Sequence, residues 1–577
     1  MPKLNKDQQA VVDYSSGQGA LLVTAAAGSG KTAVVVERVI GLLTRKEDPV
    51  DISRLLVITF TNAAAEEIRT RITAALRDKL KEDPGNRRLA REIKLLGGAE
   101  ITTIDSFLLR LVRDSFHKLG ISPDARIADQ SEVEGLSDRV MEDLLEEKYA
   151  AAEAGFLALV EMLTKGQKDQ TLPELIKHTY ESFQSMPHPE RKLMDAAKQY
   201  RDVPENVSET IWVSYLLQKA KKTVDGYIKK YESVIRDIQD DSKLAKAYGP
   251  AFLDDFEMLK RVSEAAESHG NFALQLQAET FARLGSLRGY EDTDFRDRLK
   301  ALRDDMKKEI QSLQSVFEET PEEIADELKK MAPAAQELAN LVREYSVRFL
   351  EAKTKAGILE FNDVSQYAHR LLWRTTPEGM DVPTSEALVV ADRYDEVVVD
   401  EYQDTNSLQD EIFHAITRNG RNLIMVGDVK QSIYGFRYAE PDGFVEKLHR
   451  YVSHDTTDQG NRKISLNRNY RSSGGVIDYI NFVFSHLMKK EQGGIDYNEE
   501  QKLYLGREDA SYHKTEVIYL SEADSSLSKR EYEAQMVAKR IQELVESGLM
   551  INDKGGERPV RYGDFAILLR RDRKSVV

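Results

Sequence analysis

Residues 20–32 have the sequence ALLVTAAAGSGKT, a short apolar run followed by a loop that contains two glycines and ends in Lys31 and Thr32. The apolar run has no polar–apolar alternation, which is typical of a strand buried on both faces. The apolar residues at 33–43 predict a helix after the loop. A loop between a buried strand and a helix directs backbone N–H groups and the positive end of the helix toward one point, where they bind phosphate. The stretch therefore predicts a phosphate-binding loop in a parallel α/β fold.

The side chains of this loop fit the same chemistry. Lys31 would reach the β- and γ-phosphates of a nucleoside triphosphate, and the Thr32 hydroxyl would bind Mg²⁺. The usual pattern opens with glycine, whereas Ala25 stands here, and a small residue keeps the turn tight. The residues expected to hold the nucleotide are Ala25, Ala26, Ala27, Gly28, Ser29, Gly30, Lys31 and Thr32.

An acidic pair supplies the second half of a nucleotide-hydrolysing site. Apolar runs at 55–60, 396–400 and 422–426 predict three further buried parallel strands. The run at 396–400 ends in Asp400 and is followed by Glu401. Asp400 would complete the Mg²⁺ shell through water, and Glu401 would accept a proton from the attacking water. Together with the loop, this pair predicts hydrolysis of a nucleoside triphosphate, with ATP and Mg²⁺ as cofactors.

Composition excludes several classes of protein. The chain of 577 residues contains no cysteine, which excludes disulfides and thiolate metal sites within it and fits a reducing cytoplasm. It has neither an apolar run long enough to span a membrane nor a signal peptide at its start. The net charge of −16 argues against a protein that coats DNA by bulk attraction, but not against a local DNA groove. The ten histidines are scattered without an HExxH pattern and are interpreted as structural or surface residues.

The length predicts three or four domains. Strand-like runs disappear between about 129 and 355, where apolar residues recur at helical spacing and Thr320, Pro321 and Glu323 form a helix-start signal. We expect a mainly helical domain over 129–355, inserted into a first α/β domain made of 1–128 and 356–460. A second α/β domain is expected to begin at 461–577, with a helix near 476–488 and strands at 516–520 and 565–569.

The order of the remaining motifs resembles that of the UvrD/Rep/PcrA helicases of superfamily 1. The similar stretches are LNKDQ at 4–8, TFTNAAAEEIR at 59–69, VGDVKQSIYGFR at 426–437 and LNRNYRS at 466–472. The resemblance implies two RecA-like motor domains with a P-loop NTPase site, the second only begun by residue 577. It also implies an enzyme that uses ATP to unwind DNA.

Several site residues follow from the resemblance. Gln8 stands where the family hydrogen-bonds adenine, and Gln431 where it senses the γ-phosphate. Arg471 resembles the arginine that reaches the γ-phosphate from the second motor domain, where it stabilises transition-state charge. Tyr470 would stack on adenine, with a plain core role as the alternative.

The resemblance also implies a surface for single-stranded DNA. Tyr434 and Phe436 offer faces on which bases stack. Asp105 stands where the family usually has histidine, and its charge would repel a phosphate, which weakens the assignment of its neighbours Thr103 and Ser106. The residues expected to contact DNA are Phe60, Thr61, Asn62, Thr103, Ser106, Tyr434, Phe436 and Arg437.

A finer resemblance links residues 25–38, 357–363, 425–451 and 464–497 to the A subunit of a bacterial helicase/nuclease that processes DNA double-strand breaks. It implies 3′-to-5′ translocation, action on single-stranded and duplex DNA, and a role in recombinational repair. The B subunit of such an enzyme, itself a helicase/nuclease, would be the partner, in the bacterial cytoplasm at the nucleoid. The rest of the second motor and the nuclease domain would lie beyond residue 577. We therefore expect this chain to bind nucleotide, to hydrolyse it poorly and to have no nuclease activity.

Two alternatives remain open at this point. One is a stand-alone UvrD/PcrA-like repair helicase, which the long insertion and the sequence RYAEP at 437–441 disfavour. The other is a nucleotide- and DNA-binding fragment without turnover.

Overall fold

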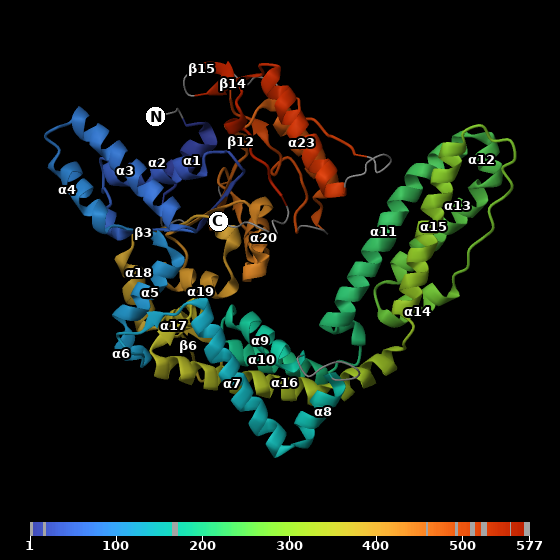
Figure 1. Cartoon of the computed structure of the whole chain (residues 1–577), viewed down its shortest axis with the longest axis horizontal. Coiled ribbons are helices and arrows are strands. Elements are labelled where there is room, and N and C mark those ends of the chain that lie inside the picture. Colours follow the sequence, from blue (N-terminus) through green and yellow to red (C-terminus); the bar gives the residue numbers. More distant parts are fainter. Residues whose placement is uncertain are drawn as a thin grey trace. The chain divides into compact units, whose positions relative to one another are not determined.

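The computed structural model describes residues 4–15, 19–163, 171–456, 460–490, 494–507, 514–520, 528–553 and 556–569 (Figure 1). The chain divides into two compact units. The larger unit comprises 1–472 and 480–510, and the smaller unit comprises 473–479 and 511–577.

A seven-stranded sheet, in which every neighbouring pair is parallel, forms the centre of the larger unit. The four predicted strands are confirmed and all lie in it. Its strands, in spatial order, are β10 (Val452–Ser453), β11 (Arg462–Leu466), β1 (Leu21–Ala25), β9 (Leu423–Gly427), β8 (Glu396–Val399), β2 (Leu55–Thr59) and β3 (Glu100–Thr103).

Helices cover both faces of this sheet. Successive side chains along a strand point to opposite faces, so they enter two different hydrophobic cores. Leu22 and Val397 point into one core, whereas Val23 and Val398 point into the other. The first core is closed by α5 (Ile104–Asp114), α6 (Phe116–Leu119), α17 (Phe361–Leu372), α18 (Ser385–Arg393), α19 (Ser407–Ala415) and α20 (Pro441–Arg450). The second is closed by α1 (Lys6–Asp13), α2 (Lys31–Thr44), α3 (Asn62–Glu82) and α4 (Arg87–Leu95). This arrangement confirms the α/β class.

Strand β11 joins the central sheet after residue 460, where the first α/β domain is predicted to end. The first α/β domain was expected to end at 460, but β11 pairs with β1 in parallel, with Ile464 beside Val23. The sheet therefore continues to Leu466. The apolar residues of β11 alternate with polar ones, so the sequence lacked the continuous apolar run that marked the other strands.

The residues between 130 and 356, here called the helical segment, leave and rejoin the α/β part at one place. The short strands β4 (Arg126–Ile127) and β5 (Ile358–Leu359) pair in parallel at its two ends. Its helices are α7 (Gln130–Ala151), α8 (Ala154–Leu163), α9 (Thr171–Gln184), α10 (Pro189–Arg201), α11 (Ile211–Asp240), α12 (Ser242–Ala247), α13 (Gly249–Ala265), α14 (His269–Ala278), α15 (Thr293–Val316) and α16 (Pro321–Ala356).

The helical segment has two cores of its own. One lies among α11, α13, α14 and α15, and the other among α7 to α10 and α16 (Figure 1). Helix α16 begins as predicted, with the Thr320 side chain accepting from the Glu323 amide and Pro321 in the first turn. No strand occurs in the described residues of this segment. Its status as a separate inserted domain stays a prediction.

Two predicted strands of the C-terminal region are wrong. Residues 516–520 and 565–569 have no ladder partner among the residues that the structure describes. Tyr519 and Leu568 are 89% and 95% exposed, so neither run has the cover that a buried strand needs. The predicted helix near 476–488 is confirmed as α21 (Gly474–Leu487), whose residues are divided between the two units. The smaller unit holds α23 (Lys529–Glu546), β14 (Met550–Asp553) and β15 (Gly556–Pro559).

Short elements complete the described chain. A hairpin joins β6 (Trp373–Thr375) to β7 (Asp381–Pro383), and β12 (Arg468–Asn469) pairs in parallel with β13 (Tyr504–Leu505). The single 3₁₀ turns are η1 (Ile52–Arg54), η2 (Leu96–Gly98), η3 (Val207–Glu209), η4 (Tyr402–Asp404), η5 (Val429–Gln431), η6 (Gly435–Arg437) and η7 (Tyr562–Asp564). Of the helices described, none is both long and apolar enough to cross a membrane.

Candidate nucleotide site and aromatic surface

The phosphate loop lies between β1 and α2, as predicted. Ser29 donates its backbone N–H to the carbonyl of Ala26 at 3.0 Å, which closes the turn. Gly28 and Gly30 have φ of 70° and 86°, a left-handed backbone that favours glycine. A Cβ on Gly28 would lie 2.8 Å from Oδ1 of Asn469, so the loop also needs glycine there for space. Lys31 and Thr32 begin α2, with their side chains partly exposed at its N-terminus.

Lys31 contacts two other residues of the predicted site. Its Nζ lies 2.8 Å from Oε2 of Glu401 and 3.4 Å from Oε1 of Gln431. These residues follow β1, β8 and β9, which are neighbours in the sheet, so their side chains converge at its C-terminal edge. Ligands bind at this edge in parallel α/β folds.

Asp400 lies beside Glu401 in an environment that disfavours two negative charges. Burial, followed by repulsion from Glu401, raises the pKa of Asp400 to about 6. Glu401 has a φ of 52°, which turns the chain sharply, and its amide donates to Oδ1 of Asp400 at 3.0 Å. A bound Mg²⁺ ion would supply the positive charge that the buried Asp400 carboxylate lacks. Asp400 and the Thr32 hydroxyl are the side chains that would hold this ion.

Gln403 organises the acidic end of the site, although no sequence pattern pointed to it. Its amide Nε2 donates to Glu401 at 2.8 Å and to Asp404 at 3.0 Å, and its Oε1 accepts from the backbone N–H of Asp428 at 2.9 Å. Asp428 in turn accepts from Nε2 of Gln431 at 2.7 Å. The side chain of Gln403 thus joins the residues after β8 to those after β9.

Asn469 is a second residue that sequence reasoning missed. It is 2% exposed, and its Nδ2 donates to the carbonyl of Ala27 at 2.9 Å. Its Oδ1 accepts from the backbone N–H groups of Arg471 and Ser472, each at 2.8 Å. Asn469 therefore fixes the phosphate loop to the segment that carries Tyr470 and Arg471. The long separation in sequence hid this contact.

Gln8 and Tyr470 lie together beside the loop. Nε2 of Gln8 donates to the carbonyl of Ser29 at 2.9 Å, and its Oε1 accepts from the amide of Asn5 at 2.9 Å. The Asn5 side chain also donates to the Tyr470 hydroxyl at 2.8 Å. The amide of Gln8 keeps one N–H and one lone pair for a base. Tyr470 is 37% exposed, which argues against the plain core role.

Arg471 lies next to the loop but is not engaged with it. Its Cβ would be 2.9 Å from a Cβ at Gly28. The side chain is exposed, and within the described ranges no hydrogen bond or ion pair to it occurs. It stays a predicted catalytic arginine.

The predicted aromatic residues form a row after β2 and β9, here called the aromatic surface (Phe60, Tyr434 and Phe436). The ring centroids of Phe60 and Tyr434 are 4.6 Å apart, and those of Tyr434 and Phe436 are 5.9 Å apart. Phe436 is 75% exposed. Tyr434 is three residues from Gln431, so this row lies close in sequence to a residue that contacts Lys31.

The polar residues predicted to contact DNA have local structural roles. Thr61 caps α3, which begins at Asn62, by accepting from the Ala64 amide at 3.1 Å. Thr103 is buried, caps α5 and donates to the Ser106 hydroxyl at 2.9 Å. The Thr103 hydroxyl is thus already used within the fold, and its contact with DNA stays a prediction. The backbone of Arg437 lies in η6, and its side chain lies outside the described residues.

Comparison with known proteins assigns the family. The model of the UvrD/REP helicase N-terminal domain matches residues 4–452. The chain belongs to the UvrD/REP helicase family. The matched range includes the phosphate loop, the acidic pair and the aromatic surface.

Curated relatives are similar over nearly the whole chain. The A subunit of the ATP-dependent helicase/nuclease of Bacillus licheniformis is 37% identical over 98% of this chain and 47% of its own length. The protein of the same name from Clostridium beijerinckii is 35% identical over 95% of this chain and 47% of its own length. The UvrD/REP chain described here thus spans about half the length of the curated relatives it matches.

Proposed function

We propose that this chain is the motor part of an ATP-dependent DNA helicase that acts as the A subunit of a helicase/nuclease in double-strand break repair. The observation that carries the proposal is the meeting of Lys31, Glu401 and Gln431 at the edge of the sheet, with Gln431 three residues before Tyr434. The family match and the names of the relatives support it. Those names favour one part of a larger enzyme over the stand-alone helicase.

The contacts of Lys31 suggest how ATP would start hydrolysis. Lys31 pairs with Glu401 at 2.8 Å, and the pair neutralises its own charges. ATP would draw Lys31 onto its β- and γ-phosphates, which releases Glu401 to orient and deprotonate the attacking water. Mg²⁺, held by Thr32 and, through water, by Asp400, would neutralise charge on the phosphates. Arg471 would add positive charge to the transition state.

The position of Gln431 suggests how hydrolysis is coupled to DNA. Gln431 is held between Lys31 and Asp428, so loss of the γ-phosphate would change its partners. The backbone from Gln431 to Tyr434 is short and would carry this change to the aromatic surface. Bases stacked on Phe60, Tyr434 and Phe436 would then be gripped or released, since each stacked base contributes about 1–3 kcal/mol.

The finer parts of the proposal rest on the resemblance. Residues 1–128 with 356–460 would be a RecA-like motor, the helical segment an inserted domain, and residues 461–577 the beginning of a second motor. Alternating grip by the two motors would move the enzyme 3′ to 5′ along single-stranded DNA. A helicase/nuclease B subunit would complete the enzyme, in the bacterial cytoplasm.

ATP hydrolysis with and without single-stranded DNA tests the proposal. We expect slow hydrolysis by this chain that increases with DNA and disappears in Lys31→Ala. Lys118→Ala is the matched control, because Lys118 pairs with Glu386 on the surface. Hydrolysis that is equal in wild type and Lys31→Ala, or that DNA leaves unchanged, would contradict the proposal.

A further inference from the structure

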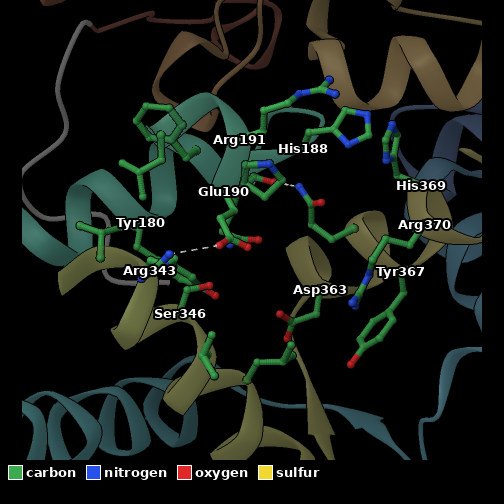
Figure 2. A pocket seen from close by; sticks show the side chains of 18 residues that line it. Tyr180, His188, Glu190, Arg191, Arg343, Ser346, Asp363, Tyr367, His369 and Arg370 are labelled. Carbon is green, nitrogen blue, oxygen red and sulfur yellow. Dashed lines mark hydrogen bonds and ion pairs between the residues drawn. The ribbon is translucent and has the colours of Figure 1, made fainter. Parts of the chain in front are cut away.

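Three side chains that commonly bind metal ions meet where the helical segment lies against α17 and α19. His188 directly precedes α10, His369 lies on α17, and Glu411 lies on α19. One ligand atom of each lies within 4.8 Å of the other two. Nε2 of His369 is 2.7 Å from Oε2 of Glu411, and the two imidazole centroids are 5.0 Å apart at 84°. Figure 2 shows the two rings near each other at one end of a cavity.

We propose that His188, His369 and Glu411 bind one divalent transition-metal ion, with Zn²⁺ as the chemistry that fits best. Imidazole nitrogen and carboxylate oxygen are preferred zinc ligands, whereas Mg²⁺ prefers oxygen alone. Two histidines and one glutamate leave a fourth tetrahedral position for water. This site is distinct from the nucleotide site and goes beyond the proposed function.

The local structure holds these ligands in place before an ion arrives. Nε2 of His188 is buried and makes no hydrogen bond among the residues that the structure describes, although Oδ2 of Asp381 lies 3.2 Å from it. Its backbone φ of 50° is strained for a residue with a Cβ, and such strain occurs preferentially at binding sites. Gln366, one turn before His369, donates its Nε2 to the carbonyls of Gln184 and Met186 at 2.8 and 2.9 Å. This fixes the chain that leads into His188.

A nearby carboxylate, that of Asp381, is already engaged by another side chain. Oδ2 of Asp381 lies 3.2 Å from Nε2 of His188, but it already pairs with Arg191 at 2.7 Å. Asp381 therefore neutralises Arg191, and we assign it no ligand role. His188 and His369 also line a cavity of about 480 Å³, which gives solvent and ions a route to the cluster (Figure 2).

The position of the cluster predicts what the ion would do. It would cross-link the start of α10 in the helical segment to α17 and α19, which pack on the central sheet. Bound zinc would therefore stabilise the attachment of the helical segment. The simpler alternative is a hydrogen bond between His369 and Glu411 with no ion.

Titration of the whole chain with Zn²⁺, and separately with Co²⁺, in excess Mg²⁺ tests the proposal. The excess Mg²⁺ occupies oxygen-rich sites such as the one at Asp400. We expect one Zn²⁺ per chain, visible Co²⁺ absorption bands and a Tm that rises with Zn²⁺. His188→Ala and Glu411→Gln should each weaken binding by about 100-fold or more, since even outer partners of a ligand contribute about 10–100-fold.

The variants separate an ion from a hydrogen bond. Glu411→Gln preserves a partner for His369 but replaces a charged ligand by a poor one, and its side chain is 41% exposed, so folding should survive. His178→Ala, on the exposed face of α9, is the matched control and should bind zinc as wild type does. Absence of zinc binding by wild type would overturn the proposal, and so would equal affinity in wild type and Glu411→Gln.

Discussion

Replacing Asn469 by alanine tests whether one buried amide holds the nucleotide site together. The variant loses three hydrogen bonds, to Ala27, Arg471 and Ser472, at 2.8–2.9 Å. At about 1 kcal/mol each, the loss is about 3 kcal/mol in the free energy of unfolding. In the variant, ordering the loop around ATP would take about 1 kcal/mol of binding free energy, the contribution of one such hydrogen bond. This lowers the affinity for ATP about tenfold. Urea denaturation and titration with a fluorescent ATP analogue measure the two effects.

Asn86→Ala is the control for this experiment. Asn86 caps α4 away from the site by accepting from the Leu89 amide at 3.1 Å, so its loss lowers stability by about 1 kcal/mol without affecting nucleotide. If Asn469→Ala binds the ATP analogue as tightly as wild type does, Asn469 does not position the nucleotide site.

Three further predictions concern the acidic pair, the aromatic surface and the buried frame. The folded-state pKa of Asp400, about 6, lies above its ordinary value of 3.8, so the folded protein keeps a proton that the unfolded chain has released. Stability should therefore fall by about 3 kcal/mol as pH rises from about 4 to 6, and urea denaturation of Asp400→Asn should lack this component. Tyr434→Ala should weaken single-stranded DNA binding about 5- to 150-fold in fluorescence anisotropy, and unchanged affinity, or an equal loss in the exposed control Phe361→Ala, would contradict the role. Glu396→Gln should lower the free energy of unfolding by about 3–5 kcal/mol, because it leaves the charge of Arg38 buried, and a loss near zero would show that water reaches the pair.

The parts of this fold that could be predicted are encoded locally. The strand before Ala25, the glycines and Lys31 lie within one stretch, so their pattern alone indicates the loop. The acidic pair was equally visible because it follows an uninterrupted apolar strand.

The parts that were missed depend on contacts between distant residues. Asn469 contacts Ala27 because β11 and β1, which precede them, are neighbours in the sheet. His188 meets His369 only because the helical segment packs against α17. Histidines that are scattered in sequence therefore showed no sign of a cluster. The strand predicted at 516–520 fails for a related reason, since an apolar run becomes a strand only where another strand pairs with it.

The affinity for labelled single-stranded DNA, measured with and without Mg²⁺ and a non-hydrolysable ATP analogue, tests most directly whether the nucleotide site and the aromatic surface are coupled. The analogue should change the DNA affinity of wild type by about 5- to 150-fold. In Gln431→Ala this change should largely disappear, while DNA affinity without nucleotide stays that of wild type. Equal DNA affinity of wild type with and without the analogue would contradict coupling between the nucleotide site and the aromatic surface. A full change in affinity in Gln431→Ala would contradict the role of Gln431 in that coupling.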